Sequence, residues 1–281
     1  MLLNSVIIIL REVLEAALLF SVLLALSKHS AIKQQWILWS AVIGVLGAAV
    51  YGLNMGLVSE WFEGVGQEVT NALIQLIIYF LLLVFISLQF KLHLLLKDEK
   101  QSVTKNAQNA MPSIQLLQPL LVFFMIVITT LAITREGAEM LLYFFSVTRN
   151  EHHYISTLIG MIIGASIGVS IGFLFYYLLV TVFCKWNMII ALSLLILVSS
   201  GMLSQATQLL IQADWIEAQL PLWDSSFLLS EKSVVGQLMY ALIGYESTPT
   251  AIQAVLYLSG LILPVFIIMI IWKNHFMNVP K

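Results

Sequence analysis

Two short segments place charged side chains among apolar residues, and both read Arg-Glu-x-x-Glu. One lies within residues 10–16 and the other within residues 134–140. Residues three or four apart share one face of a helix, so each segment presents two carboxylates and one guanidinium together. The charged residues are Arg11, Glu12 and Glu15 in the first segment and Arg135, Glu136 and Glu139 in the second.

The excess of carboxylates over guanidiniums predicts a cation site. If the two segments meet, four glutamates and two arginines leave two negative charges for a bound cation to balance. Carboxylate oxygens are hard ligands that suit Fe³⁺, Mg²⁺, Ca²⁺ and Mn²⁺, and they also accept Fe²⁺. The only cysteine, Cys184, has no partner for a soft-metal site, which argues against copper. In the alternative interpretation, each arginine only neutralises the glutamate beside it.

Other acidic residues gather between the apolar stretches. They are either solvated loop charges or a field that concentrates cations at the mouth of a pore. This outer acidic group comprises Glu60, Glu63, Asp214, Glu217 and Asp224.

The sequence contains no familiar enzymatic motif. Gly-x-Ser-x-Gly, His-Glu-x-x-His and phosphate-binding loops are all missing, so we expect a protein that is not an enzyme and has no permanently bound cofactor. An intramembrane enzyme whose glutamates do acid–base work on a lipid is the alternative of a different class. There is no basic patch with interleaved aromatic residues, which argues against a nucleic-acid partner. His29, His93 and His275 are expected to face lipid headgroups.

The elements that carry these charges are predicted to be membrane-spanning helices. Of 281 residues, 60% are apolar and only 10% are charged, whereas soluble domains carry about 25% charged residues. The apolar runs are continuous and do not alternate, which favours helices over a barrel. We therefore predict an all-α polytopic membrane protein with seven spans: 4–27, 36–58, 70–96, 115–147, 155–183, 187–211 and 250–272.

The two charged segments also indicate an internal repeat. They are offset by 124 residues, and the same offset relates Gly44 to Gly168. With three spans in each half, the first and fourth spans run in opposite directions, which is typical of inverted repeats with a site near the membrane midplane. The predicted units are a first repeat (1–97), a cytoplasmic linker (98–114), a second repeat (115–212), an outer acidic loop (213–249) and a seventh helix with its tail (250–281). Within that loop, the apolar stretch 234–245 predicts a short interfacial or re-entrant helix.

The distribution of basic residues predicts the orientation. With seven spans, one side holds only Arg149 and Lys232. The positive-inside rule therefore places the N-terminus outside and the C-terminus in the cytoplasm. The first apolar run lacks a basic leader and a cleavage site, so we expect it to be a helix of the mature protein. The basic residues on the predicted cytoplasmic side are Lys28, Lys33, Lys91, Lys97, Lys100, Lys105, Lys185, Lys273 and Lys281.

The sequence resembles the high-affinity iron permeases of the oxidase-dependent iron transporter family. The resemblance rests on the two Arg-Glu-x-x-Glu segments in the first and fourth spans. It extends to the acidic Gly-Gln-Glu segment within 63–68, to Leu222-Trp223-Asp224-Ser225-Ser226, and to Gly244, Tyr245 and Pro249. Two positions depart from the family pattern: Val13 replaces a glycine that is common in bacterial members, and Asn71 replaces an acidic residue.

The resemblance implies a function and a set of site residues. Glu12, Glu15, Glu136 and Glu139 would bind iron during passage into the cytoplasm, Glu68 would assist, and Arg11 and Arg135 would hold the carboxylates in place. It also implies the inner membrane of a bacterium and a periplasmic partner that supplies iron: an oxidase, a peroxidase or an iron-binding protein. A permease for another cation, such as Mn²⁺ or Pb²⁺, is the alternative within transport.

Overall fold

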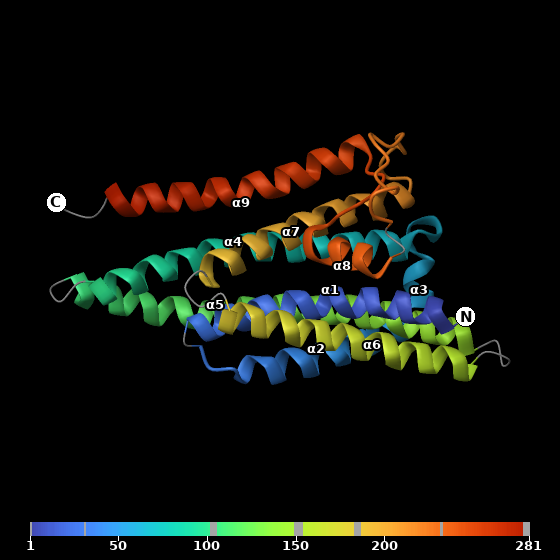
Figure 1. Cartoon of the computed structure of the whole chain (residues 1–281), viewed down its shortest axis with the longest axis horizontal. Coiled ribbons are helices and arrows are strands. Elements are labelled where there is room, and N and C mark those ends of the chain that lie inside the picture. The colour runs from blue at the N-terminus through green and yellow to red at the C-terminus, as the bar shows by residue number, and fades with distance from the viewer. Residues whose placement is uncertain are drawn as a thin grey trace.

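The protein is built from helices, most of which run along a common axis (Figure 1). The structure is a computed structural model and describes residues 2–30, 32–101, 106–148, 154–182, 187–230 and 233–277, among which there is no β-strand. The elements are α1 (Leu2–His29), α2 (Gln35–Leu53), α3 (Met55–Ser59), η1 (Trp61–Gly64), α4 (Gly66–Gln101), α5 (Asn106–Thr148), α6 (Tyr154–Tyr177), the π-helix η3 (Leu178–Val182), α7 (Asn187–Gln212), α8 (Val234–Ile243) and α9 (Ala251–Met277). The predicted all-α class is confirmed.

Six of the seven predicted spans coincide with helices that could cross a membrane. By length and composition these lie within α2, α4, α5, α6, α7 and α9. The remaining helix, α1, has 28 residues, which is long enough to span a bilayer. Its composition differs because it carries the first charged segment and Lys28. The prediction of a multi-pass membrane protein is confirmed on the basis of these apolar helices.

The second predicted span, 36–58, is too long. Helix α2 ends at Leu53, and the short helix α3 begins after Asn54. The Asn54 side-chain amide donates to the carbonyl oxygen of Val50 at 2.7 Å, and the Asn54 backbone N–H donates to the same oxygen at 3.2 Å. Asparagine side chains often bond to nearby backbone groups, which makes asparagine less favourable inside a helix than at its end.

Helical residues also occupy parts of the predicted linker and outer loop. In the linker, α4 extends to Gln101 and α5 begins at Asn106. In the loop, the predicted short helix is α8. The Ser233 hydroxyl accepts a hydrogen bond from the Gly236 N–H at 3.0 Å and caps its start. Gly244 ends it with φ +64°, a left-handed conformation that glycine adopts without strain.

Two pairs of helices pack closely: α1 lies along α6, and α2 lies along α5. Helix α4 packs against α7 and α5, and α9 packs against α7 on the outside of the bundle (Figure 1). Glycines allow the close approach. A Cβ atom on Gly164 would lie only 2.6 Å from the carbonyl oxygen of Val6, and one on Gly44 would lie 2.8 Å from the Ile133 Cβ. Small residues at such interfaces let membrane helices approach closely.

The contacts in these two interfaces correspond to one another. In one set, residues 44, 48 and 52 of α2 meet residues 133, 137 and 141 of α5; in the other, residues 164, 168 and 172 of α6 meet residues 9, 13 and 17 of α1. The numbers shift by 124 between α1 and α5 but by 120 between α2 and α6. Gly44 therefore corresponds to Gly164, one helical turn away from the Gly168 that the sequence offset indicates, because the chain from residue 133 to residue 164 is four residues shorter than the chain from residue 9 to residue 44.

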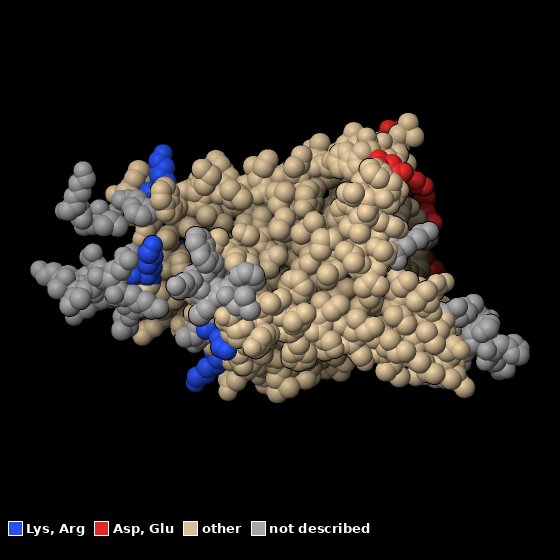
Figure 2. Space-filling model, viewed as in Figure 1, with Lys and Arg blue, Asp and Glu red and all other residues tan. Residues whose placement is uncertain are grey.

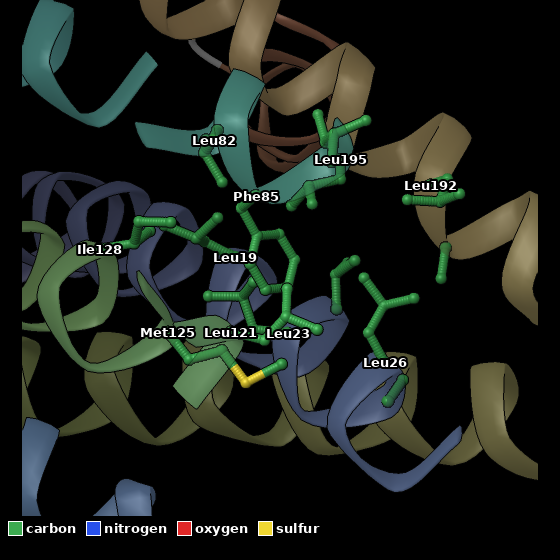
Figure 3. Close-up of a cluster of buried hydrophobic side chains, with 14 of the residues drawn as sticks. Leu19, Leu23, Leu26, Leu82, Phe85, Leu121, Met125, Ile128, Leu192 and Leu195 are labelled. Atoms are coloured by element: carbon green, nitrogen blue, oxygen red, sulfur yellow. The ribbon is translucent and has the colours of Figure 1, made fainter. Parts of the chain in front are cut away.

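A cluster of buried apolar side chains fills the space between α1, α4, α5 and α7 (Figure 3). On α1 its members follow Glu15, and on α5 they precede Arg135. The cluster therefore adjoins the charged segments on one side. The labelled members are Leu19, Leu23, Leu26, Leu82, Phe85, Leu121, Met125, Ile128, Leu192 and Leu195.

The two ends of the bundle carry opposite charge. The lysine and arginine side chains that Figure 2 shows lie at the end where α9 finishes, and the acidic ones lie at the end where α1 begins. Five of the basic residues used to predict the orientation lie outside the described residues: Lys105, Arg149, Lys185, Lys232 and Lys281.

We expect Gly164→Ala to destabilise the protein by about 1–3 kcal/mol, because the added methyl group would press on the backbone of α1. Gly56→Ala is the matched control, since a Cβ atom at Gly56 meets nothing within 4 Å. Thermal unfolding of both variants in one detergent measures the difference. An unchanged melting temperature for Gly164→Ala would show that α1 and α6 are not in close contact.

Candidate metal centre

The two charged segments meet between α1 and α5, and one guanidinium joins them. Nη1 of Arg135 lies 3.3 Å from Oε2 of Glu15, a residue 120 positions away, and the same nitrogen pairs with Glu136. Nη2 of Arg135 lies 3.3 Å from Oε1 of Glu139. Arg135 is only 6% exposed. A single buried cation therefore bridges three carboxylates from two helices.

Three of the four motif glutamates also form a group of their own. Glu12, Glu136 and Glu139 each offer an oxygen that lies within 4.8 Å of the other two. Glu12 and Glu136 are 8% and 3% exposed, and each has one buried oxygen without a hydrogen-bond partner. Carboxylates this close repel one another in a low-dielectric site unless a cation or a proton lies between them. We call these three residues the carboxylate triad; its oxygens could hold a metal ion.

Glu15 lies outside this triad and has different partners. Its Oε1 is 3.4 Å from Nε of Arg11, and its Oε2 accepts from Arg135. Both of its oxygens are thus engaged by guanidiniums. The sequence treats the four glutamates alike, and only the three-dimensional arrangement separates Glu15 from the other three.

The two arginines also differ in their surroundings. The Arg11 side chain is 37% exposed, and its Cζ lies 4.1 Å from the centre of the Tyr240 ring. This is a cation–π contact with the short helix α8. Leu10, Leu14 and Leu18 of α1 pack against Ala241 and Leu242 of α8. Because α8 contacts α1, Arg11 has an aromatic partner, whereas Arg135 contacts carboxylates.

Two residues hold Glu139: Asn71, which the sequence marked only as a departure from the family pattern, and Tyr51, which the sequence did not indicate. The Asn71 amide of α4 donates to Oε1 of Glu139 at 3.0 Å, and the Tyr51 hydroxyl of α2 donates to Oδ1 of Asn71 at 2.8 Å. Asn71 is buried. The available signal was its spacing, since Asn71 falls one helical turn after Glu68 and shares its face of α4.

The other predicted acidic residues are not in the triad. Glu68 lies in the first turn of α4, one turn from Asn71, and is half-buried. The members of the outer acidic group are all exposed. The Ser226 side chain and backbone N–H, the latter at 2.8 Å, lower the pKa of Asp224, which favours its charged form. These residues could attract cations but do not coordinate one together with the triad.

One cavity adjoins the triad, and another has no triad residue in its wall. The first, of about 460 Å³, lies between α1, α2, α5 and α6; Glu12 and Glu136 lie in its wall, and most of its other lining is apolar. The other, of about 310 Å³, lies beside α9. Trp223, Gly244, Tyr245 and Pro249 line it, so segments that carry the family resemblance converge there.

We expect Arg135→Gln to cost about 3–5 kcal/mol of stability, because it leaves several buried carboxylates without their shared cation. Arg11→Gln should cost no more than about 1 kcal/mol, since that side chain is partly exposed. Unfolding of the two variants under the same conditions gives the comparison. Equal losses would contradict the unequal surroundings of the two arginines.

Comparison with known protein families identifies the chain. A family model described as the iron permease FTR1 family matches residues 2–277, nearly the whole sequence. Neither a curated protein nor a solved structure matches the chain. The match includes both charged segments and every helix that the structure describes, from the start of α1 to the end of α9. It confirms the resemblance seen in the sequence. The protein belongs to the iron permease FTR1 family, a family of transporters and not of enzymes.

Proposed function

We propose that the protein moves iron into the cytoplasm and that the carboxylate triad binds the ion during passage. The observation that carries this proposal is the meeting of three carboxylates from α1 and α5 within 4.8 Å. Two of them have a buried oxygen without a hydrogen-bond partner. Carboxylate oxygens suit ferric iron and also accept ferrous iron.

In this proposal Arg135 stabilises the carboxylates when no iron is bound and leaves enough negative charge for a cation to bind. Its contacts with Glu15, Glu136 and Glu139 offset part of the negative charge when no iron is bound. Glu12 forms no ion pair with Arg135. Of the four motif glutamates, it is the one whose negative charge no arginine balances directly. An arriving ion would supply the missing positive charge, and the nearby guanidinium would limit how tightly the ion is held.

We propose that α1 also crosses the membrane, as the first of seven spans. Glu15 pairs with Arg135 of α5, and Arg11 lies over the Tyr240 ring of α8; such partners reduce the cost of placing the charges in a membrane. The start of α1 and the end of α9 lie at opposite ends of the bundle (Figure 1), as an odd number of crossings requires. The matching contacts of α1 with α6 and of α5 with α2 support an inverted three-plus-three repeat.

The proposed direction follows from charge. The acidic end would face outside, where it would concentrate cations, and the basic end would face the cytoplasm (Figure 2). With the bacterial inner membrane as its location, a periplasmic protein that supplies iron would meet the acidic end. In this conformation the apolar cluster separates the triad from the basic end. Iron would therefore need a rearrangement of α1 and α5, or a route along the larger cavity beside Glu12 and Glu136.

We expect Glu12→Gln and Glu136→Gln to weaken iron binding at least about tenfold, since even residues that only support metal ligands contribute about 10–100-fold. Iron uptake by proteoliposomes that contain either variant should fall as iron binding weakens. Glu217→Gln, on an exposed loop, is the control for general loss of negative charge. Competing Mn²⁺ in the same assay tests the alternative cargo. Wild-type uptake by both triad variants would overturn the proposal.

The orientation has its own test. In a Cys184→Ser background, Glu217→Cys should react with a membrane-impermeant maleimide in intact cells. Lys273→Cys should react only after the cells are permeabilised, because it lies at the basic end. The opposite pattern of labelling would reverse the proposed direction.

A further inference from the structure

Two histidines that are far apart in the sequence meet at the basic end of the bundle. His29 belongs to the last turn of α1 and His93 to α4. Their ring centroids are 5.7 Å apart, with the rings tilted by 35°. Metal–nitrogen bonds of about 2.1 Å place two imidazoles on one ion with centroids on the order of 5–6 Å apart. That spacing is compatible with a shared metal ion, and the rings are accessible, since His29 is exposed and His93 is half-buried.

A buried amide lies next to His93 on α4. Gln89 lies one turn before His93 on the same face of α4, and it is almost fully buried. Its Nε2 donates to the hydroxyl of Ser30 at 2.7 Å and lies 4.0 Å from Sδ of Met188. Its Oε1 is buried and has no hydrogen-bond partner. An unsatisfied carbonyl oxygen in a buried position is costly, and a cation beside it would remove that cost.

The C-terminus of α1 favours a cation beside His29, whereas the nearby lysines oppose one. His29 lies at the C-terminus of α1, where the unpaired carbonyl groups carry partial negative charge. Lys28 and Lys91 are the neighbouring cations, and both are exposed, so their ammonium groups can extend into water away from the rings.

This place is distinct from the carboxylate triad. Fourteen residues of helix separate Glu15 from His29, which corresponds to about 21 Å. The apolar cluster, which includes Leu26 and Leu92, lies between the two places. The sequence alone gave no reason to pair His29 with His93, because each is a single histidine near the end of a predicted span.

We propose that His29 and His93, with Gln89 as a supporting ligand, form a second metal site for a divalent first-row ion such as Fe²⁺. Imidazole nitrogen is a borderline ligand that suits ferrous iron better than it suits the hard cations. The role of this site rests on the proposed function: it would receive the ion after the triad, at the cytoplasmic end. Its existence as a binding site does not depend on transport.

The test counts ferrous ions bound to the full-length purified protein under anaerobic conditions by equilibrium dialysis. The wild type should bind one ion at each site. His29→Ala and His93→Ala should each remove one ion and leave the other, and Gln89→Leu should weaken the same ion by about tenfold. His275→Ala is the matched control, because it removes a histidine from another helix at the same end and should change nothing.

The double variant Glu12→Gln/Glu136→Gln separates this inference from the proposed function. It should lose the triad ion and retain the one at the histidines. If the triad variant binds as the wild type does while His93→Ala loses an ion, the proposed triad is wrong and the histidine site stands. A third variant, His93→Gln, is the more conservative change. If all three histidine variants bind as many ions as the wild type does, the second site does not exist. Equal loss in His275→Ala would show that binding at this end is nonspecific and would also overturn it.

Discussion

The ion pairs of Arg135 are the interaction on which the rest of the structure depends. Arg135 lies within an apolar bundle and contacts Glu15, Glu136 and Glu139 from two helices. A charge left alone in such a place would be strongly destabilising. Because the guanidinium satisfies several carboxylates at once, α1 and α5 can bring their charged segments to the same place. One buried oxygen of Glu12 and one of Glu136 still have no hydrogen-bond partner.

Close packing makes that meeting possible. Glycines on α6 lie against the backbone of α1, and glycines on α2 lie against α5. Each charged helix thus packs against a glycine-rich helix on one side. The apolar cluster fills the bundle next to the residues that follow Glu15 on α1 and precede Arg135 on α5. The carboxylate triad therefore lies between a rigid apolar region and a cavity of about 460 Å³. Along this part of α1 and α5, carboxylate oxygens meet at the triad and apolar side chains lie beyond it.

The two motifs are alike in sequence and unlike in surroundings. Arg11 lies over the ring of Tyr240, whereas Arg135 is enclosed by carboxylates. Asn71, supported by Tyr51, holds Glu139. These differences come from α8 and from α4, which contact one motif and not the other. A repeated sequence can therefore give one segment that mainly positions side chains and another that supplies most of the carboxylates.

Local features of the sequence determined the class of fold and the kind of ligand. Continuous apolar runs predict membrane helices because the bilayer requires them, and clustered carboxylates with too few guanidiniums predict a hard cation. The pattern also predicted α8 and most helix bounds, although it missed the break at Asn54, whose side chain bonds back to the Val50 carbonyl oxygen. Tertiary structure alone decided which residues meet: the grouping of Glu12 with Glu136 and Glu139, the separate place of Glu15, the register of Gly44 with Gly164, and the pairing of His29 with His93. Helical periodicity tells which face a residue is on, but it does not tell which helix lies opposite that face or at what height.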